Sequence, residues 1–197
     1  MAMIAILGNT GIMYPWSGRM KTLVAYYSKS GNNEYLARRL ASELGCDCER
    51  IAPRFGGMFF QLLFTAFKKG FGIRSLSRDP AGYDRVVVCG PLWMGHLAYP
   101  ALAFIKRHGV KIPSLCFATC CGCDDSQKDD QFGYGAVFTM LEGMMRGKLI
   151  AAEAFSVGMI LPEGAPSEEV MKARLSDANF TGAIAERFAR FLVKVKA

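Results

Sequence analysis

Residues 22–33 read Thr-Leu-Val-Ala-Tyr-Tyr-Ser-Lys-Ser-Gly-Asn-Asn, and this stretch decides the fold. Its first half is a run of apolar, β-branched and aromatic residues, which is typical of a buried strand. Its second half contains small hydroxyl residues, glycine and asparagine, which are typical of a turn. A helical pattern follows, because Leu36, Leu40 and Leu44 recur every fourth residue up to Gly45. The stretch therefore predicts a strand, a turn and a helix in succession.

The same alternation of strand and helix continues along the chain. A weaker strand is expected at residues 46–51, and further apolar runs that are typical of strands lie at residues 85–90, 114–119 and 149–157. Helical patterns lie at residues 57–69, 100–109 and 133–146 and in the segment from Ile184 to Val195. Continuous apolar strands separated by helices indicate a parallel sheet covered on both faces. The sequence therefore predicts an α/β fold with a doubly wound, five-stranded parallel sheet.

The composition is typical of one globular domain. The chain has 197 residues, of which 51% are hydrophobic and 21% charged, and no apolar run is long enough to cross a membrane. We expect a domain at residues 20–197 and an N-terminal extension at residues 1–19, which fits nothing in the alternation. Met20 directly precedes the first strand, so we expect that the assigned start of the chain lies too far upstream. Seven cysteines without a recognisable export signal favour reduced thiols and a cytoplasmic location.

The formal net charge is +7, and much of it lies in one segment. Residues 51–80 contain five Lys or Arg residues and a single acidic residue, Asp79. The helical pattern at residues 57–71 leaves little polar face, so we expect one side to pack on the sheet. Its other side belongs to a candidate contact surface at residues 54–78. This surface would contact a second copy of the chain in a homodimer, an anionic membrane surface or an apolar acceptor, or it would be covered by residues 70–80. The alternative is a solvated helix face, and no motif favours nucleic acid.

The turn at residues 28–33 is a candidate anion site. Backbone N–H groups at a helix start, hydroxyl side chains and the helix dipole together favour a phosphate group. The alternative is an ordinary capped turn, since serine and asparagine are common caps. The sequence contains no G-x-x-x-x-G-K-[ST], and no G-x-G-x-x-G follows the first strand. Cys48 and Arg54 match the C-x5-R spacing of cysteine phosphatases, but Glu49 between them would repel phosphate.

A second candidate loop follows the strand at residues 85–90. Trp93 lies in this loop between Gly90 and Gly95, and a tryptophan at the carboxyl end of a strand offers a flat face to a planar ring. The alternative is that Trp93 caps the core. His96 is the candidate for donating or relaying a proton, and no other residue stands out as catalytic.

These loops resemble those of the flavodoxin-like family. Ser-Lys-Ser-Gly-Asn-Asn at residues 28–33 is similar to its [ST]-x-[ST]-G-x-[TN] phosphate loop, residues 83–95 to its second flavin loop, and residues 118–122 to its third. The resemblance covers about residues 20–195 and implies the strand order 2-1-3-4-5 and a bound FMN. It implies phosphate contacts from Ser28, Lys29, Ser30, Gly31, Asn32 and Asn33. It implies ring contacts from Pro91, Leu92, Trp93, Met94 and Gly95, and looser contacts from Thr119, Cys120, Cys121 and Gly122.

The chain departs from the family's pattern in three ways. Asn33 stands where threonine is commoner, and the third loop starts without an aromatic residue, so a second ring would come from Phe132 or Tyr134. The chain is also basic, whereas electron-carrier flavodoxins are usually acidic. This difference puts docking to basic reductases in doubt and leaves FMN itself as the expected cofactor.

The resemblance implies an FMN-dependent oxidoreductase. The basic, apolar segment favours reduction of a quinone-like or other small acceptor, with electrons from NAD(P)H or a redox protein. The alternative is a flavodoxin-type carrier that passes single electrons between partners. A further alternative places redox or metal chemistry at the thiols of Cys120 to Cys123, but the aspartates that follow would raise the thiol pKa values. A fourth zinc ligand is also missing, so we expect no metal.

Overall fold

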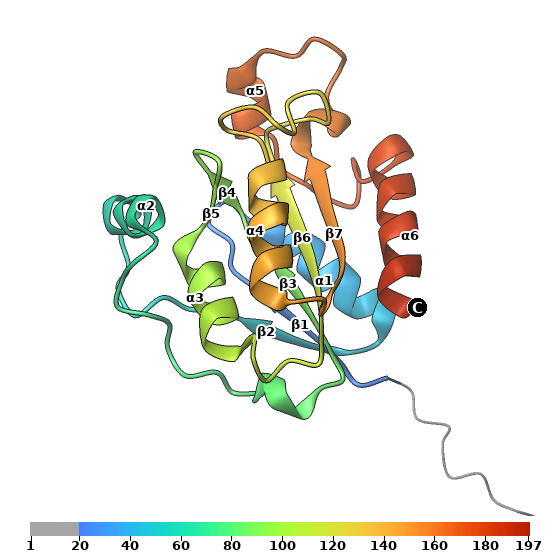
Figure 1. Cartoon of the computed structure of the whole chain (residues 1–197). Helices are drawn as coiled ribbons and strands as arrows, with labels where there is room; N and C mark the ends of the chain where they lie inside the picture. Colours follow the sequence, from blue (N-terminus) through green and yellow to red (C-terminus); the bar gives the residue numbers. More distant parts are fainter. Residues whose placement is uncertain (1–19) are drawn as a thin grey trace, which may run out of the picture.

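The computed structural model describes residues 20–197, so the predicted extension at residues 1–19 lies outside the described residues. It contains a five-stranded parallel sheet with the order β2-β1-β3-β6-β7 (Figure 1). Counted along the chain among themselves, these strands have the predicted order 2-1-3-4-5. The strands are β1 (Thr22–Tyr26), β2 (Asp47–Arg50), β3 (Arg85–Cys89), β6 (Ser114–Cys121) and β7 (Leu149–Ser156). The predicted doubly wound α/β class is therefore confirmed.

Helices cover both faces of the sheet. They are α1 (Asn32–Leu44), α3 (Tyr99–His108), α4 (Gly135–Met145) and α6 (Gly182–Lys196). Successive residues of a strand point to opposite faces, so β1 contributes to two cores. Leu23 and Ala25 pack with residues of α3 and α4, whereas Val24 and Tyr26 pack with residues of α1 and α6.

The carboxyl ends of the neighbouring strands β1 and β3 lie at one level, and β6 passes this level at Ala118. Tyr26 of β1 pairs with Cys89 of β3, and Cys89 pairs with Ala118 of β6. β6 and β7 continue beyond this level, to Cys121 opposite Ser156. β6 is therefore longer than predicted, and the segments after β1, β3 and β6 all leave the sheet at one edge, where ligands of open α/β sheets bind.

Some short elements differ from the sequence prediction. A small hairpin, β4 (Leu92–Trp93) and β5 (His96–Leu97), follows β3, and a short helix, α5 (Ser167–Lys172), lies between β7 and α6. Two 3₁₀ turns lie at Pro80–Gly82 and Val157–Ile160. Elements of two to six residues are too short to show a helical or strand period in the sequence, so the pattern does not predict them.

α2 (Met58–Phe67) also differs from its prediction. It packs against α3 and the β4–β5 hairpin rather than on the sheet, and it lies at the outside of the molecule in Figure 1. The loop after it does not cover its apolar side, because Phe71 and Phe67 are both exposed. No helix in the described part of the chain, α2 included, is long and apolar enough to cross a bilayer.

Candidate functional site

The predicted phosphate turn connects β1 to α1. The Ser28 hydroxyl oxygen accepts a hydrogen bond from the N–H of Gly31 at 3.1 Å, which closes the turn. Gly31 directly precedes α1 and has a φ of 97°, a left-handed conformation that glycine adopts without steric strain. A Cβ at Gly31 would meet no atom within 4 Å, so only the backbone conformation requires glycine there. Lys29, Ser30 and Gly31 are exposed at the edge of the sheet.

The amino end of α1 offers donors to an anion. The N–H groups of Asn32, Asn33 and Glu34 form no hydrogen bond within residues 20–197, as is usual in the first turn of a helix. The Glu34 carboxylate is occupied by the Tyr26 hydroxyl at 3.1 Å and by Arg38 Nε at 2.9 Å. Free N–H groups at the positive end of the helix dipole fit a phosphate group.

The side chains of Asn32 and Asn33 bind other parts of the backbone. Asn33 Nδ2 donates to the carbonyl oxygen of Cys120 at 3.1 Å, and Asn33 Oδ1 accepts from the N–H of Cys120 at 2.9 Å. Asn32 Nδ2 donates to the carbonyl oxygen of Ala173, and Asn32 Oδ1 accepts from the N–H of Leu175, both at 3.0 Å. The family resemblance implies a phosphate contact from Asn33, but the side-chain amide of this residue is already paired. The backbone N–H groups of both residues remain for a ligand.

The second predicted loop is the β4–β5 hairpin, and its tip contacts the segment after β6. Trp93 pairs with His96, and Met94 and Gly95 form the tip with φ values of 51° and 73°. Positive φ at both positions is typical of a two-residue hairpin loop. A Cβ at Gly95 would overlap the carbonyl oxygen of Gln131. Gly95 is therefore required both by its conformation and by the close approach of the two segments.

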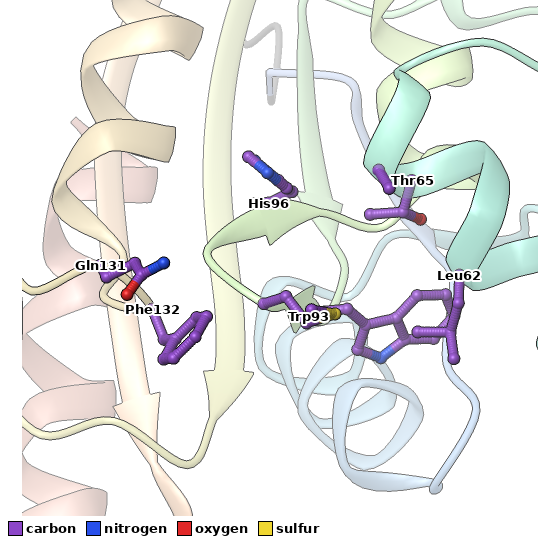
Figure 2. A pocket seen from close by; sticks show the side chains of 8 residues that line it. Leu62, Thr65, Trp93, His96, Gln131 and Phe132 are labelled. Atoms are coloured by element: carbon purple, nitrogen blue, oxygen red, sulfur yellow. The ribbon is translucent and has the colours of Figure 1, made fainter.

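Trp93 forms one wall of a cavity beside the hairpin (Figure 2). Its ring lies edge-on to Tyr27, with the ring centroids 5.9 Å apart and an interplanar angle of 78°. The cavity has a volume of about 350 Å³ and lies between the hairpin, α2 and the segment after β6. It is lined by Leu62, Thr65, Ala66, Trp93, Met94, His96, Gln131 and Phe132. Because Tyr27 directly precedes Ser28, the cavity wall and the candidate phosphate turn are neighbours, although residues 28–33 do not line the cavity.

The predicted ring-contact residues at the start of the hairpin differ in exposure. Pro91 is buried and its carbonyl oxygen accepts the N–H of Ala98 at 3.0 Å. Leu92 is half-buried and packs against the core. Trp93 is also half-buried, and Met94 at the tip is exposed.

Three of the predicted third-loop residues belong to the sheet. Thr119, Cys120 and Cys121 are buried at the end of β6, and Gly122 is the first residue beyond the strand. Burial raises the pKa of Cys121 to about 12 and raises the pKa of Cys120 further, so both thiols stay protonated at neutral pH. Burial also raises the pKa of the half-buried Cys123. Protonated thiols are poor nucleophiles, and no group of three potential ligands within residues 20–197 is placed to hold a metal ion.

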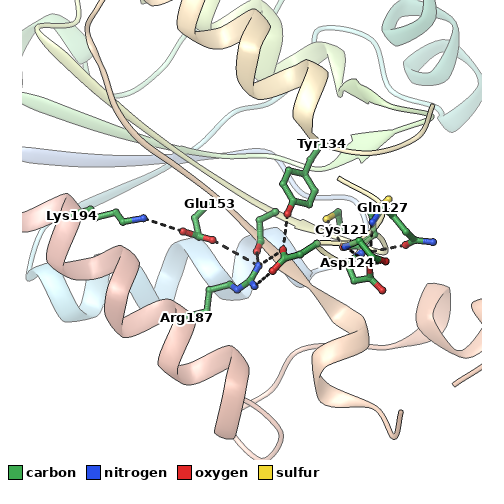
Figure 3. A network of polar contacts seen from close by, with 11 residues as sticks. Cys121, Asp124, Gln127, Tyr134, Glu153, Arg187 and Lys194 are labelled. Carbon is green, nitrogen blue, oxygen red and sulfur yellow. Dashed lines mark hydrogen bonds and ion pairs between the residues drawn. The ribbon is translucent and has the colours of Figure 1, made fainter. Parts of the chain in front are cut away.

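A polar network attaches the segment after β6 to α6 (Figure 3). The Asp125 carboxylate accepts hydrogen bonds from both terminal nitrogens of Arg187 and from the Tyr134 hydroxyl, the last at 2.6 Å. The bonds from Arg187 are the main reason that the pKa of Asp125 falls to about 2. Arg187 also lies 3.8 Å from Glu153 of β7. Since Tyr134 is buried and bonded here, Phe132 is the exposed ring beside the cavity.

Comparisons with solved structures agree with this architecture. No protein-family model matches the sequence, and no curated protein matches it. A solved structure of a protein from Bacteroides eggerthii has a TM-score of 0.56 at 19% identity, over 77% of this chain and 94% of that chain. A flavoprotein from Lactobacillus acidophilus in complex with FMN also has a TM-score of 0.56, at 18% identity, over 71% of this chain and 95% of that chain.

A third solved structure extends the similarity to more of the chain. It is a WrbA-like flavodoxin from Agrobacterium tumefaciens, with a TM-score of 0.50 at 16% identity, over 90% of this chain and 95% of that chain. Identities this low show the fold alone. Together with the strand order 2-1-3-4-5, these similarities show that the chain has the flavodoxin-like fold that its loops predict.

Proposed function

We propose that this protein binds FMN, with the phosphate at residues 28–33 and the flavin ring at the Trp93 cavity. The observation that carries the proposal is the contact between Tyr27 and Trp93, because Tyr27 leads directly into the candidate anion site and Trp93 forms an aromatic wall. Helix starts with free N–H groups bind phosphate, and tryptophan faces bind planar rings. The flavoprotein from Lactobacillus acidophilus, which has a similar fold and contains FMN, supports the same assignment.

The residues divide into two groups with different roles. The N–H groups at the start of α1 and the hydroxyl groups of Ser28 and Ser30 would bind the phosphate. Trp93, Met94 and the exposed Phe132 would contact the ring. When bound, FMN supplies the redox chemistry, and the protein holds it and limits its access to water.

We infer further that the flavin reduces a quinone-like or other small apolar acceptor, with NAD(P)H or a redox protein as electron donor. The cavity is a fit for such an acceptor, because Leu62 and Ala66 of α2 join Trp93 in its lining. His96 lies in the same lining, where it would donate or relay a proton to the acceptor. The alternative is a carrier that passes single electrons between protein partners.

The absorption spectrum of the purified full-length chain tests the proposal when it is followed during anaerobic reduction. We expect a flavin spectrum with about one FMN per chain, and reduction in a single two-electron phase. We also expect steady-state reduction of a soluble quinone by NADH or NADPH. Two separate one-electron phases without NAD(P)H turnover would favour the carrier. A colourless protein that takes up no added FMN would overturn the proposal.

A further inference from the structure

α2 presents apolar residues outward and polar residues inward. Gln61 and Thr65 face the protein and are 3% and 2% exposed, and the Thr65 hydroxyl oxygen accepts the N–H of Tyr99 at 2.9 Å. On the opposite side, Phe59 and Phe67 are 72% and 69% exposed. A surface helix of a globular protein normally has the reverse arrangement. The outward phenylalanines therefore do not hold α2 in place.

The exposed apolar surface continues into the segments on both sides of α2. The rings of Phe55 and Phe71 lie 4.6 Å apart between centroids, and both rings are more than half exposed. We call the combined surface the phenylalanine face: Phe55, Phe59, Phe60, Leu63, Phe67 and Phe71. Single exposed apolar residues are ordinary, but a contiguous surface of this kind marks a contact site.

Basic residues lie next to the residues of the phenylalanine face along the chain. Arg54, Lys68, Lys69 and Arg74 are exposed, and none of them forms an ion pair with a carboxylate within residues 20–197. The sequence has no Asp or Glu at residues 50–78. The charge of this segment is therefore entirely positive, which favours an anionic partner.

A cation-lined hollow opens beside the same face. It has a volume of about 420 Å³, and its lining includes Arg54, Lys106 and Arg107 together with the rings of Phe71 and Tyr99. The hollow thus combines positive charge with apolar walls. This is the chemistry that a phosphate-bearing lipid headgroup and the start of its acyl chains require.

We propose that the phenylalanine face docks on the surface of an anionic lipid bilayer. The phenylalanine rings insert below the headgroups, the neighbouring cations contact lipid phosphates, and the hollow beside Arg54 takes one headgroup. α2 has 10 residues and is about 15 Å long, so it lies in the plane of the membrane surface rather than crossing it. This inference goes beyond the proposed function and requires no bound flavin.

The positive charge also argues against a second copy of this chain as the occupant. A two-fold dimer formed through this face would bring the positively charged segments of both copies, which contain Lys68 and Lys69, into one interface. The face offers no carboxylate to pair with them, since residues 50–78 contain none. Like charges at an interface oppose association, whereas the same charges favour binding to an anionic bilayer.

Co-sedimentation of the full-length chain with vesicles tests the proposal. The vesicles are phosphatidylcholine alone or phosphatidylcholine with a quarter phosphatidylglycerol, at low and high salt. We expect binding on the order of tenfold stronger to the anionic vesicles, and weaker binding at high salt because exposed charges are screened. Absence of binding to anionic vesicles at low salt would overturn the proposal.

Two double variants separate the apolar and the charged contributions. Phe59→Asp with Phe67→Asp should abolish binding, and Lys68→Glu with Lys69→Glu should weaken it by about tenfold or more. The matched controls lie on α6, across the molecule in Figure 1: Val193→Asp, whose side chain is 69% exposed, and Arg190→Glu with Lys196→Glu. The controls should bind like the unaltered chain, and circular dichroism should show that every variant is folded.

Sedimentation velocity in the absence of lipid decides between the bilayer and a second copy. We expect a monomer whose sedimentation does not change in the Phe59→Asp and Phe67→Asp double variant. A dimer that this double variant dissociates would overturn the proposal in favour of self-association. Equal loss of vesicle binding in the α6 controls would overturn it as well, because binding would then follow net charge alone.

Discussion

The side-chain amide of Asn33 pairs with the backbone of Cys120 in both directions. Asn33 donates to the Cys120 carbonyl oxygen at 3.1 Å and accepts from the Cys120 N–H at 2.9 Å. Asn33 is 1% exposed, so both hydrogen bonds are shielded from water. The pair attaches the first turn of α1 to the end of β6, and it therefore joins the candidate phosphate turn to the neighbouring strand of the candidate site.

Replacing Asn33 should destabilise the protein. In Asn33→Leu, the buried N–H and carbonyl oxygen of Cys120 lose their partners, at a cost of about 1–3 kcal/mol each. We expect the free energy of unfolding in urea to fall by roughly 2–4 kcal/mol. Asn179→Leu is the control, because Asn179 forms two hydrogen bonds that are exposed to water, and it should lower stability by less than about 1 kcal/mol. Equal losses in both variants would show that the Asn33 pair has no special role.

Charge at Gly31 should decide whether the turn retains a phosphate. Gly31→Glu and Gly31→Gln impose the same strain, because both place a side chain at a φ of 97°, and neither Cβ meets another atom. Only glutamate adds a negative charge at the start of α1. We expect Gly31→Gln to keep FMN with reduced affinity and Gly31→Glu to lose it, as measured by equilibrium dialysis. Similar affinities for the two variants would place the phosphate elsewhere.

Trp93 should contribute to flavin binding through its ring. Trp93→Ala should weaken FMN binding by about 1–3 kcal/mol, which is the scale of aromatic burial and stacking. It should also raise the flavin fluorescence of the complex, because a stacked tryptophan quenches that emission. Trp93→Phe keeps an aromatic ring beside Tyr27 and should weaken binding less. If neither variant changes affinity or emission, then Trp93 only closes the core.

The ion pair between Asp125 and Arg187 should make stability depend on pH at the acidic end. The pKa of Asp125 falls to about 2 in the folded protein, against an ordinary value near 4. The stabilisation is therefore complete above about pH 4 and is lost as the pH falls toward about 2. Asp125 is 59% exposed, so solvent screening limits the contribution to about 0.5–1 kcal/mol.

Urea unfolding at a series of pH values checks this dependence. Asp125→Asn should be less stable than the unaltered chain at pH 7, and the two curves should converge as the pH approaches about 2. Asp130→Asn is the control, because Asp130 lies in the same segment and forms no ion pair within the described residues. A difference for Asp125→Asn that stays constant with pH would mean that the effect is not due to this carboxylate's charge.

The sheet could be predicted from the sequence because a local pattern of residues marks its strands. The runs at residues 23–26 and 86–89 are apolar throughout, and the helices along the chain have clear periods. The turn at residues 28–33 could also be predicted, since its residue types act within a few positions. Features that depend on a single segment could thus be predicted from the sequence.

The remaining features depend on contacts between distant segments. Nothing near Asn32 indicates that its amide binds Ala173 and Leu175. The orientation of α2 could not be predicted either, because a helix with few polar residues does not show that Gln61 and Thr65 will face inward. The pattern favoured packing on the sheet, but hydrogen bonds and contacts to α3 determined the orientation.

The hydrogen bonds that Asn32 and Asn33 form with later segments set the order in which a growing chain can complete this edge of the sheet. The partner of Asn33 lies 87 residues further along the chain, and the carbonyl partner of Asn32 lies 141 residues further. At about 5–20 residues per second of synthesis, roughly 7–30 s separate the appearance of Asn32 from that of Ala173. Contacts of such long range also form slowly in refolding. A newly made chain that stops before Ala173 would therefore contain every residue of the turn and still lack one of the two contacts that hold it.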